Sequence, residues 1–176
     1  AGVLWAYPHG GAKDNGVCVS HGMAPKISTI DPYYMAQYAV DEAVRNSIAT
    51  GGLIEKTCAL DNFCWPDPVL SKNNPNGDIE CGNLVRTCVG LAEICEAYGI
   101  PLVSGKDSMK NNFSGSNNKG DPLKISVLPT LLVTAMSQIP VNHVITTDFK
   151  KEGDLIFIVG KQRPGLDCSE YSDFYH

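Results

Sequence analysis

Four successive residues past the middle of the chain combine groups that suit phosphate chemistry: Gly105, Lys106, Asp107 and Ser108. Glycine lets the backbone approach a ligand closely, and lysine supplies a compact positive charge for a phosphate. Aspartate can hold a magnesium ion or orient the lysine, and serine can donate to a phosphate oxygen. The segment is not a Walker A loop, because Asp107 stands where that motif has Ser or Thr. An ordinary surface turn has the same residue types, so both interpretations stay open.

A second polar pair, Asp61 and Asn62, follows the short apolar run 57–60. Ligands of α/β proteins bind at the ends of neighbouring strands. We therefore expect this pair to lie near the segment 105–108. The alternative is a loop-capping pair without a ligand, because Asp and Asn side chains readily bond nearby backbone groups.

Glu42 and Asn46 are the third candidate pair, four residues apart in a segment with helical periodicity. That spacing places both side chains on one helix face. A carboxylate and an amide oxygen there can reach one hard cation, such as magnesium bound to nucleotide phosphates. A solvated helix face is the competing interpretation. We expect all three groups of polar residues to gather in one hollow around a metal-bound polyphosphate.

Two helices are predicted to position these residues. Asp31 and Pro32 are typical of a helix start, and Thr50 followed by two glycines stops that helix. Asp78 is predicted to cap a second helix, which ends at Gly99. We expect the second helix to bury one face, which consists of Leu84, Cys88, Leu91, Cys95 and Tyr98.

The expected strands alternate with these helices and indicate an α/β domain. Short strands are predicted at 17–20, 57–60 and 102–103, and a buried strand at 154–159. Residues 111–121 are rich in Asn, Gly and Ser and predict a mobile connection. The apolar run 123–139 contains Pro129, which predicts two strands or a sheet edge.

Composition limits the class of protein. The chain has 176 residues, 43% hydrophobic and 19% charged, with a net charge of −5, enough for one domain and part of a second. The negative charge argues against a general nucleic-acid binder. No apolar run approaches the roughly 20 residues that span a bilayer, and no charged-then-apolar leader is present, so we expect a cytoplasmic protein without a membrane partner. The non-Met start and the unpatterned end suggest a piece of a longer polypeptide.

The seven cysteines do not indicate a metal site. Cys81, Cys88 and Cys95 recur every seven residues, which separates neighbours on a helix by roughly 10 Å. That is too far for a shared zinc ion or a disulfide. We expect them to be small residues that face the core.

Several ordered motifs together resemble the phosphoribosylformylglycinamidine synthase family, in the second of its two aminoimidazole-ribonucleotide-synthase-like (AIR-synthase-like) halves. The likeness extends from about Val17 to Ile139, and 155–159 is similar to the first strand of the following C-terminal subdomain. The motifs are Asp31-Pro32-Tyr33, Asp41-Glu42-Ala43, Arg45-Asn46, the segment from Ala59 to Trp65, and the segment from Pro101 to Met109.

The resemblance implies an ATP-dependent ligase of purine biosynthesis. In this family ATP phosphorylates the amide oxygen of formylglycinamide ribonucleotide, and ammonia released from glutamine displaces the phosphate. Magnesium and cationic donors neutralise the phosphoryl charge. Residues 1–148 would then be an AIR-synthase-like N-terminal domain with a mixed sheet and helices on one face. Residues 149–176 would be the truncated start of the C-terminal domain.

The resemblance also implies partners. The sheet would pair with the first N-terminal-type domain of the synthase to build a shared barrel, and a glutaminase domain or subunit would supply ammonia. The isolated chain would dimerise through that sheet, because large exposed apolar patches seldom persist on monomers. It would have no ligase activity by itself. The cofactors implied are ATP and Mg²⁺.

Residue roles follow from the matched positions. Asp61 and Gly105 match ATP contacts, and Ser108 matches a substrate contact. Lys106 stands where the small form of the enzyme has a magnesium-binding Asn. The motif Gly-Lys-Asp-Ser-Met is instead similar to the long, single-chain form. In that form Glu42 and Asn46 match magnesium ligands of a tightly held nucleotide. The implied nucleotide-binding set is Asp61, Asn62, Gly105, Lys106 and Asp107.

Whether this half serves turnover or a structural nucleotide stays open. The other classes considered are a different ATP-dependent member of the fold group, such as AIR synthase, selenophosphate synthase or thiamine-phosphate kinase, and a non-catalytic nucleotide-binding domain.

Overall fold

The computed structural model describes residues 1–5, 7–11, 13–161, 165–166 and 169–175. The chain divides into two compact units, residues 1–145 and residues 146–176, and each is described by itself. The predicted site residues all lie in the first unit.

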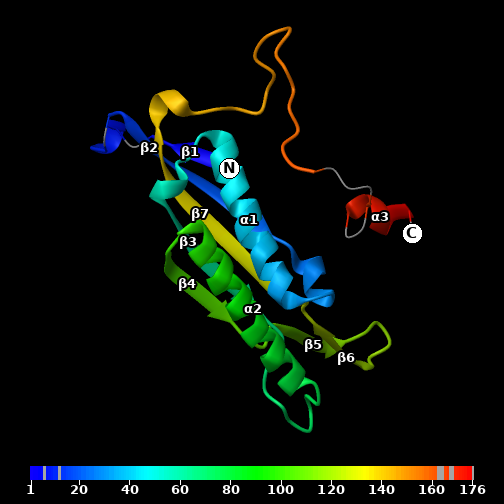
Figure 1. The fold of residues 1–176 in the computed structure, drawn as a ribbon. Coiled ribbons are helices and arrows are strands. Elements are labelled where there is room, and N and C mark those ends of the chain that lie inside the picture. The colour runs from blue at the N-terminus through cyan, green and yellow to red at the C-terminus, as the bar shows by residue number, and fades with distance from the viewer. Residues whose placement is uncertain (6, 12, 162–164, 167–168, 176) are drawn as a thin grey trace. The chain divides into compact units, whose positions relative to one another are not determined.

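A five-stranded mixed sheet forms the frame of the first unit, among its described residues (Figure 1). Its order is β1-β2-β7-β3-β4, in which β3 and β4 are parallel and the other neighbours are antiparallel. The strands are β1 (Gly2–Leu4), β2 (Asn15–Met23), β3 (Thr57–Cys64), β4 (Leu102–Ser108) and β7 (Thr130–Pro140). The predicted mixed sheet is confirmed.

Two long helices lie on one face of this sheet (Figure 1). They are α1 (Pro32–Thr50) and α2 (Gly77–Tyr98). The Asp31 side chain accepts a hydrogen bond from the Tyr33 N–H, as an N-cap should. Gly51 and Gly99 end the helices with φ of +104° and +67°, a backbone region that favours glycine. Both predicted helices and the packing of helices on one face are confirmed.

The start of α2 differs from the prediction. Asn76 occupies the N-cap position, and Asp78 lies inside the first turn. The Asp78 Oδ1 accepts from the Ile79 N–H, and a carboxylate there still suits the positive end of the helix. The short helices are η1 (Tyr7–His9), η2 (Pro25–Thr29), η3 (Ile54–Lys56), η4 (Val141–His143) and α3 (Glu170–Tyr175).

The core lies between the helices and the sheet. Met35 of α1, Trp65 after β3 and Leu131 of β7 are fully buried there. Each buried side chain of this size contributes about 1.5–3 kcal/mol. Gly22 of β2 permits the closest approach: a Cβ at this position would lie 2.0 Å from the Ala39 carbonyl oxygen. The small residues of α1 therefore let this helix lie directly on β2.

The buried face of α2 is only partly as predicted. Leu91 and Cys95 are buried and Leu84 and Tyr98 are half-buried, but Cys88 is exposed. Cys81 is exposed as well, so only one of the three cysteines faces the core. The reason is that α2 meets α1 along Thr87, Gly90 and Leu91: a Cβ on Gly90 would lie 2.4 Å from the Tyr33 carbonyl oxygen. Cys88 follows Thr87 by one residue, so it lies about 100° around the helix from this buried contact line.

β3 and β4 are longer than predicted, and this changes the setting of the candidate site. Their parallel register pairs Asp61 with Gly105, Asn62 with Lys106 and Cys64 with Ser108. The predicted loops at 61–62 and 105–108 are therefore strand residues. Tertiary pairing overrides the low strand propensity of Gly, Asp, Asn and Lys at these positions.

The connection predicted to be mobile at 111–121 instead contains a strand. β5 (Asn112–Ser116) and β6 (Pro122–Ser126) form a separate antiparallel hairpin. Pro129 lies between β6 and β7, so the prediction of two strands in the run 123–139 is confirmed. β7 buries Leu131 and Val133 toward the helices, while the alternate residues Leu132 and Met136 are half-buried on the other face.

The second unit does not contain the strand predicted at 154–159. Side chains from Leu155 to Val159 are 71–94% exposed and have no strand assignment. A strand of this composition needs a paired neighbour and an apolar cover, and the described residues of this unit supply neither. Across the described parts of both units, no helix is long and apolar enough to cross a membrane.

Candidate functional site

Glu42 and Asn46 both contact the backbone of β2 from α1. The Met23 N–H donates to Glu42 Oε2 at 2.8 Å. The Asn46 Nδ2 donates to the His21 carbonyl oxygen at 2.9 Å. The sequence predicts that these two side chains share a helix face, and the structure adds that this face lies over a strand.

Asp61 and Asp107 line a different hollow, between α2 and the strands β3 and β4. This cavity has a volume of about 360 Å³. Its other walls are mainly apolar, from Phe63, Leu84, Cys88, Leu91, Ala92, Leu102 and Met109. Two carboxylates thus face one apolar space, and no basic side chain is among its described walls.

Gly105 makes room for this carboxylate pair. A Cβ at Gly105 would lie 2.7 Å from Asp61 Oδ1, so a side chain at this position would displace the Asp61 carboxylate. Burial raises the pKa of Asp61, and the neighbouring Asp107 carboxylate raises this pKa further. The pair consequently favours a proton or a cation between its oxygens.

Lys106 and Ser108 lie on the opposite face of β4. Side chains alternate along a strand, so these two residues point away from Asp61 and toward the face that carries Asn62. The Lys106 Nζ donates to the Ser108 Oγ. These two side chains therefore bond each other on the sheet face that carries no helices. Asn62 of β3 is the register partner of Lys106.

The eight predicted site residues thus form three groups rather than one. The shared hollow expected for Asp61, Lys106 and Glu42 is not found among the described residues: the cavity beside Asp61 includes neither of the others. The groups nevertheless lie at the same end of the sheet. Leu132 of β7 pairs with Met23 on one side and with Asn62 on the other, which separates β2 from β3 by two strand spacings, about 10 Å.

Asn111 is a residue that sequence reasoning missed. Its Nδ2 donates to Cys64 Sγ at 3.1 Å and to the Ser108 carbonyl oxygen at 3.0 Å. Its backbone N–H donates to the Trp65 carbonyl oxygen at 3.0 Å. Asn111 therefore ties the ends of β3 and β4 together. The preceding Lys110 has a φ of +62°, unusual for a non-glycine residue, and no sequence signal marks it.

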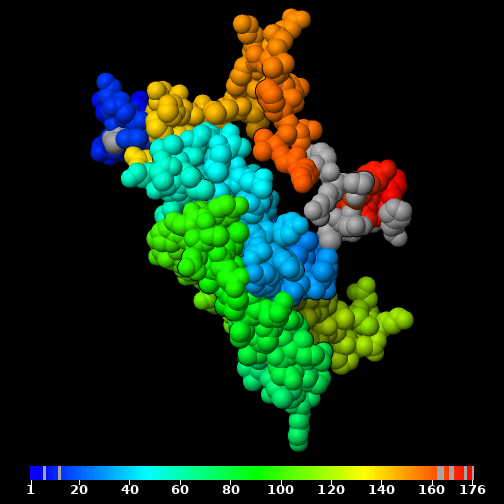
Figure 2. All heavy atoms as spheres, viewed as in Figure 1, coloured from blue at the N-terminus to red at the C-terminus, as the bar shows by residue number. Residues whose placement is uncertain are grey.

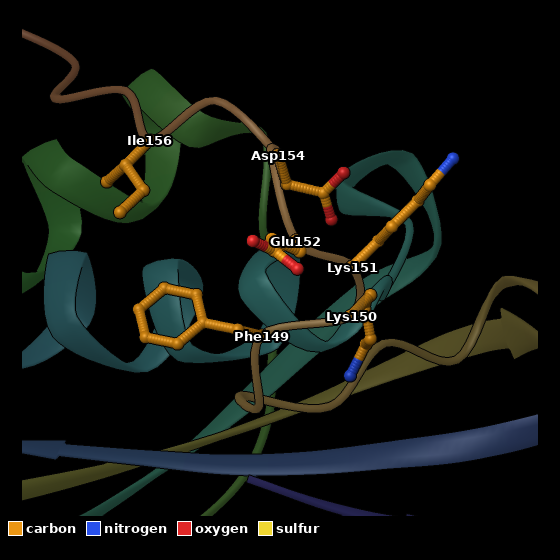
Figure 3. A pocket seen from close by; sticks show the side chains of 6 residues that line it. All are labelled: Phe149, Lys150, Lys151, Glu152, Asp154 and Ile156. Carbon is orange, nitrogen blue, oxygen red and sulfur yellow. The ribbon is translucent and has the colours of Figure 1, made fainter.

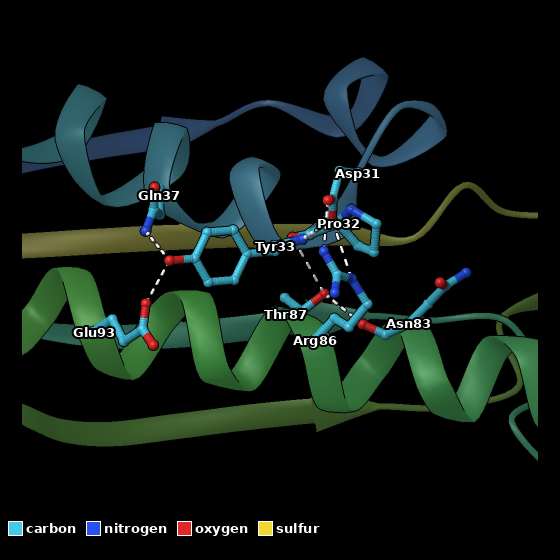
Figure 4. Close-up of polar contacts among 8 residues, drawn as sticks. All are labelled: Asp31, Pro32, Tyr33, Gln37, Asn83, Arg86, Thr87 and Glu93. Carbon is cyan, nitrogen blue, oxygen red and sulfur yellow. Dashed lines mark hydrogen bonds and ion pairs between the residues drawn. The ribbon is translucent and has the colours of Figure 1, made fainter.

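A polar network joins α1 to α2 and fixes the first helix over the sheet (Figure 4). Arg86 pairs with Asp31 at 2.5 Å, and this contact holds the pKa of Asp31 below its usual value. The Tyr33 hydroxyl donates to Glu93 and accepts from the Gln37 amide. These contacts lie about one to three turns before Glu42 and hold the first half of its helix.

The donor set for a metal ion is small. Among the described residues, no group of three or more His, Cys, Asp or Glu side chains could hold one. Glu42 Oε1 and Asn46 Oδ1 are oxygens of the kind that Mg²⁺ prefers. Mg²⁺ is commonly bound by one or two protein ligands, with phosphates and water completing its shell. The pair therefore fits a magnesium ion that arrives with a polyphosphate.

A further cavity of about 360 Å³ lies within residues 146–176 (Figure 3). Its walls are Phe149, Lys150, Lys151, Glu152, Asp154 and Ile156. Lys150 is held by Asp148, with 2.7 Å between Nζ and Oδ1. This hollow contains none of the predicted site residues.

Comparison with protein families defines the class. The model of the AIR synthase related protein, N-terminal domain, matches residues 3–128. The match covers more than half of the chain, which therefore belongs to this family. This agrees with the mixed sheet and the two helices described above.

Individual relatives are PurL-like. The chain is 31% identical over 148 residues to the phosphoribosylformylglycinamidine synthase subunit PurL of Methanothermobacter marburgensis, which covers 84% of this chain and 18% of that protein. It is 30% identical over 156 residues to the PurL subunit of Thermococcus sibiricus, over 85% of this chain and 19% of the relative. The resemblance seen in the sequence is confirmed, and the chain spans about a fifth of these relatives.

Solved structures show the same fold. Thermotoga maritima PurL complexed with ADP superimposes with a TM-score of 0.60 at 22% identity, over 77% of this chain and 20% of that one. The structure of PurLQS from the same organism gives a TM-score of 0.59 at 22% identity, with the same coverage.

Proposed function

We propose that this chain is part of an ATP-dependent ligase that converts formylglycinamide ribonucleotide and glutamine-derived ammonia to formylglycinamidine ribonucleotide in de novo purine biosynthesis. The observation that carries the proposal is the 31% identity to an archaeal PurL subunit over 84% of the chain. Residues 1–148 are the AIR-synthase-like N-terminal domain and 149–176 the start of a C-terminal domain. The protein acts in the cytoplasm.

The proposed roles follow the matched family positions, and they cut across the three groups of the site. Glu42 and Asn46 hold the magnesium ion of a bound nucleotide. Asp61, Asn62, Gly105, Lys106 and Asp107 contact nucleotide, and Ser108 contacts substrate. Magnesium neutralises phosphate charge when bound, while Lys106 adds a fixed positive charge on the face without helices. The solved PurL complex with ADP supports nucleotide binding by this fold.

A second candidate is a nucleotide held for structural reasons. The observation that favours it is the distribution of the ligands: Glu42 and Asn46 bond β2, whereas Asp61 and Asp107 face the cavity under α2. One nucleotide phosphate group does not contact both pairs at once. In this second candidate function, Glu42 and Asn46 hold a cation that serves assembly. A different part of the synthase then performs turnover.

The proposed partners complete the enzyme. The sheet face opposite the helices, with half-buried Leu132 and Met136, suits pairing with the other half of the synthase in a shared barrel. A glutaminase domain or subunit supplies ammonia; the structure of PurLQS from Thermotoga maritima supports association with other parts of the synthase. The isolated chain forms a homodimer through the same face and lacks ligase activity.

Calorimetric titration of the folded chain with ADP in MgCl₂ tests the proposal. We expect saturable, magnesium-dependent binding that Glu42→Ala abolishes. Glu55→Ala is the matched control, because Glu55 is an exposed carboxylate on a separate turn. Absence of magnesium-dependent binding by the folded wild-type chain would contradict the proposal. Binding that survives Glu42→Ala would remove Glu42 from the site.

A further inference from the structure

Glu42 and Asn46 each use only one of their two terminal atoms on β2. Glu42 accepts through Oε2, and Asn46 donates through Nδ2. Among the described residues, neither side chain makes another hydrogen bond. Each side chain therefore keeps one oxygen, Oε1 or Oδ1, that is not engaged.

The strand is open at this place because its edge partner is short. Among the described residues of this region (1–5, 7–11 and 13 onward), β1 pairs with β2 from Val17 to Val19 only. Beyond Val19 the outward backbone groups of β2 need other partners, since unpaired strand edges are unfavourable. The His21 carbonyl and the Met23 N–H find these partners on α1.

These backbone contacts fix the direction of both side chains. A carbonyl oxygen can only accept, so Asn46 must present its NH₂ group to His21 and turn its oxygen away. The Met23 N–H can only donate, so it holds one carboxylate oxygen of Glu42. The remaining two oxygens come from positions one helical turn apart, about 6 Å along the axis. They form a pair with a set orientation.

We propose that the β2 backbone at His21 and Met23 orients the magnesium ligands of this domain. The inference rests on the proposed function, in which Glu42 and Asn46 hold the cation of a nucleotide. Each side chain can bond β2 and a cation at the same time. One terminal atom bonds the β2 backbone, and the remaining oxygen is left for the cation. Outer contacts of this kind commonly change metal affinity 10–100-fold.

Met23→Pro tests the inference most sharply. Proline removes the N–H that holds Glu42, and Met23 is the last residue of β2 on an edge that β1 leaves open, where proline is tolerated. Met23→Ala is the matched control, because it shortens the side chain and keeps the N–H. The readout is Mn²⁺ binding in the presence of ADP, followed by electron paramagnetic resonance of the free ion. We expect the Mn²⁺ dissociation constant to rise about tenfold in Met23→Pro and to change less than twofold in Met23→Ala.

Asn46→Asp is a second variant that does not alter the strand. The new carboxylate keeps an oxygen and adds negative charge, so a simple ligand would bind Mn²⁺ more tightly. A carboxylate cannot donate to the His21 carbonyl, and it places two acceptors against each other. The inference predicts that Mn²⁺ affinity does not rise. A tighter dissociation constant in Asn46→Asp would overturn it.

The outcomes separate this inference from the proposed function. If wild-type chain binds Mn²⁺ with ADP and the two Met23 variants bind it equally, the orienting role is wrong and the nucleotide proposal stands. If folded wild-type chain binds no Mn²⁺ with ADP, both are overturned. If Met23→Pro fails to fold by circular dichroism, the Asn46→Asp result decides.

Discussion

Two regions at the same end of the sheet hold candidate ligands in opposite ways. Over β2, Glu42 and Asn46 complete the hydrogen bonding of a strand edge and so contribute to the fold without a ligand. Beside β4, Asp61 and Asp107 face each other in an apolar cavity, and their mutual repulsion opposes the fold. Residues of similar chemistry are thus stabilising in one region and destabilising in the other. The difference lies in the neighbours: Glu42 and Asn46 bond the β2 backbone, whereas Asp61 is partly buried beside a second carboxylate.

The largest expected effect tests how closely α1 lies on β2. Gly22→Ala places a Cβ 2.0 Å from the Ala39 carbonyl oxygen and 2.6 Å from the Ala43 nitrogen. Neither backbone atom can move without shifting the helix, so we expect a loss of about 3 kcal/mol in the free energy of unfolding. Urea denaturation followed by circular dichroism measures it.

Gly82→Ala is the control for this substitution, because a Cβ at Gly82 meets nothing within 4 Å. That variant should gain about 0.5–1 kcal/mol from helix propensity. Equal stability of the Gly22 variant and wild type would show that α1 does not lie on β2 as described.

An intermediate effect concerns the strand contact of Asn46. Asn46→Ala removes the donor to the His21 carbonyl, and we expect a loss of about 1 kcal/mol in the free energy of unfolding. Asn83→Ala is the matched control, because it also replaces an Asn inside a helix, and the Asn83 side chain makes no hydrogen bond with the described residues. The difference between the two variants in urea denaturation isolates the contact. Equal stability of the two variants would show that the Asn46 side chain lies in solvent and does not bond β2.

The smallest expected effect is a gain in stability instead of a loss, and it concerns the carboxylate pair beside β4. Asp61→Asn removes one charge of the carboxylate pair and should stabilise the chain at pH 7 by roughly 0.5 kcal/mol, because water screens this open cavity. The folded-state pKa of Asp61 lies above its ordinary value of 3.8. Protonated Asp61 therefore contributes to the stability of the wild-type chain. This contribution is fully present below pH 3.8 and is lost as pH rises through the folded-state pKa.

Thermal denaturation from pH 3 to pH 8 measures this gain. Asp61→Asn should be more stable than wild type only as pH rises above 3.8, the ordinary pKa of Asp61. Asp14→Asn, the same substitution at an exposed position, is the control. An advantage that grows toward low pH would contradict the repulsion between Asp61 and Asp107.

Local signals in the sequence predict the helices well. Asp31 with Pro32 marks the start of α1, and Gly51 and Gly99 mark two helix ends, because each acts through the backbone of its own neighbours. The i, i+4 spacing of Glu42 and Asn46 is equally local. Their strand partners are not predictable in this way, since His21 and Met23 come near α1 only through the fold of the sheet.

The segment Gly105–Ser108 shows where local reasoning fails. Its residue types favour a turn, yet the register with β3 extends the strand through it. That register shifts between Ala59 and Leu60, which decides that Gly105 and Asp107 face the cavity while Lys106 faces away. The run from Leu155 to Val159 fails for a related reason, because its composition favours a strand that no described neighbour pairs with.

Paramagnetic broadening tests the central claim most directly. The ¹⁵N-labelled chain is titrated with Mn²⁺ and ADP, and amide signals close to the ion broaden. The account predicts that broadening centres on the amides of Met23 and of residues 42–46. Broadening centred on Asp61 and Asp107 would contradict the account, because it would place the cation under α2 and leave Glu42 and Asn46 as structural contacts of β2 alone.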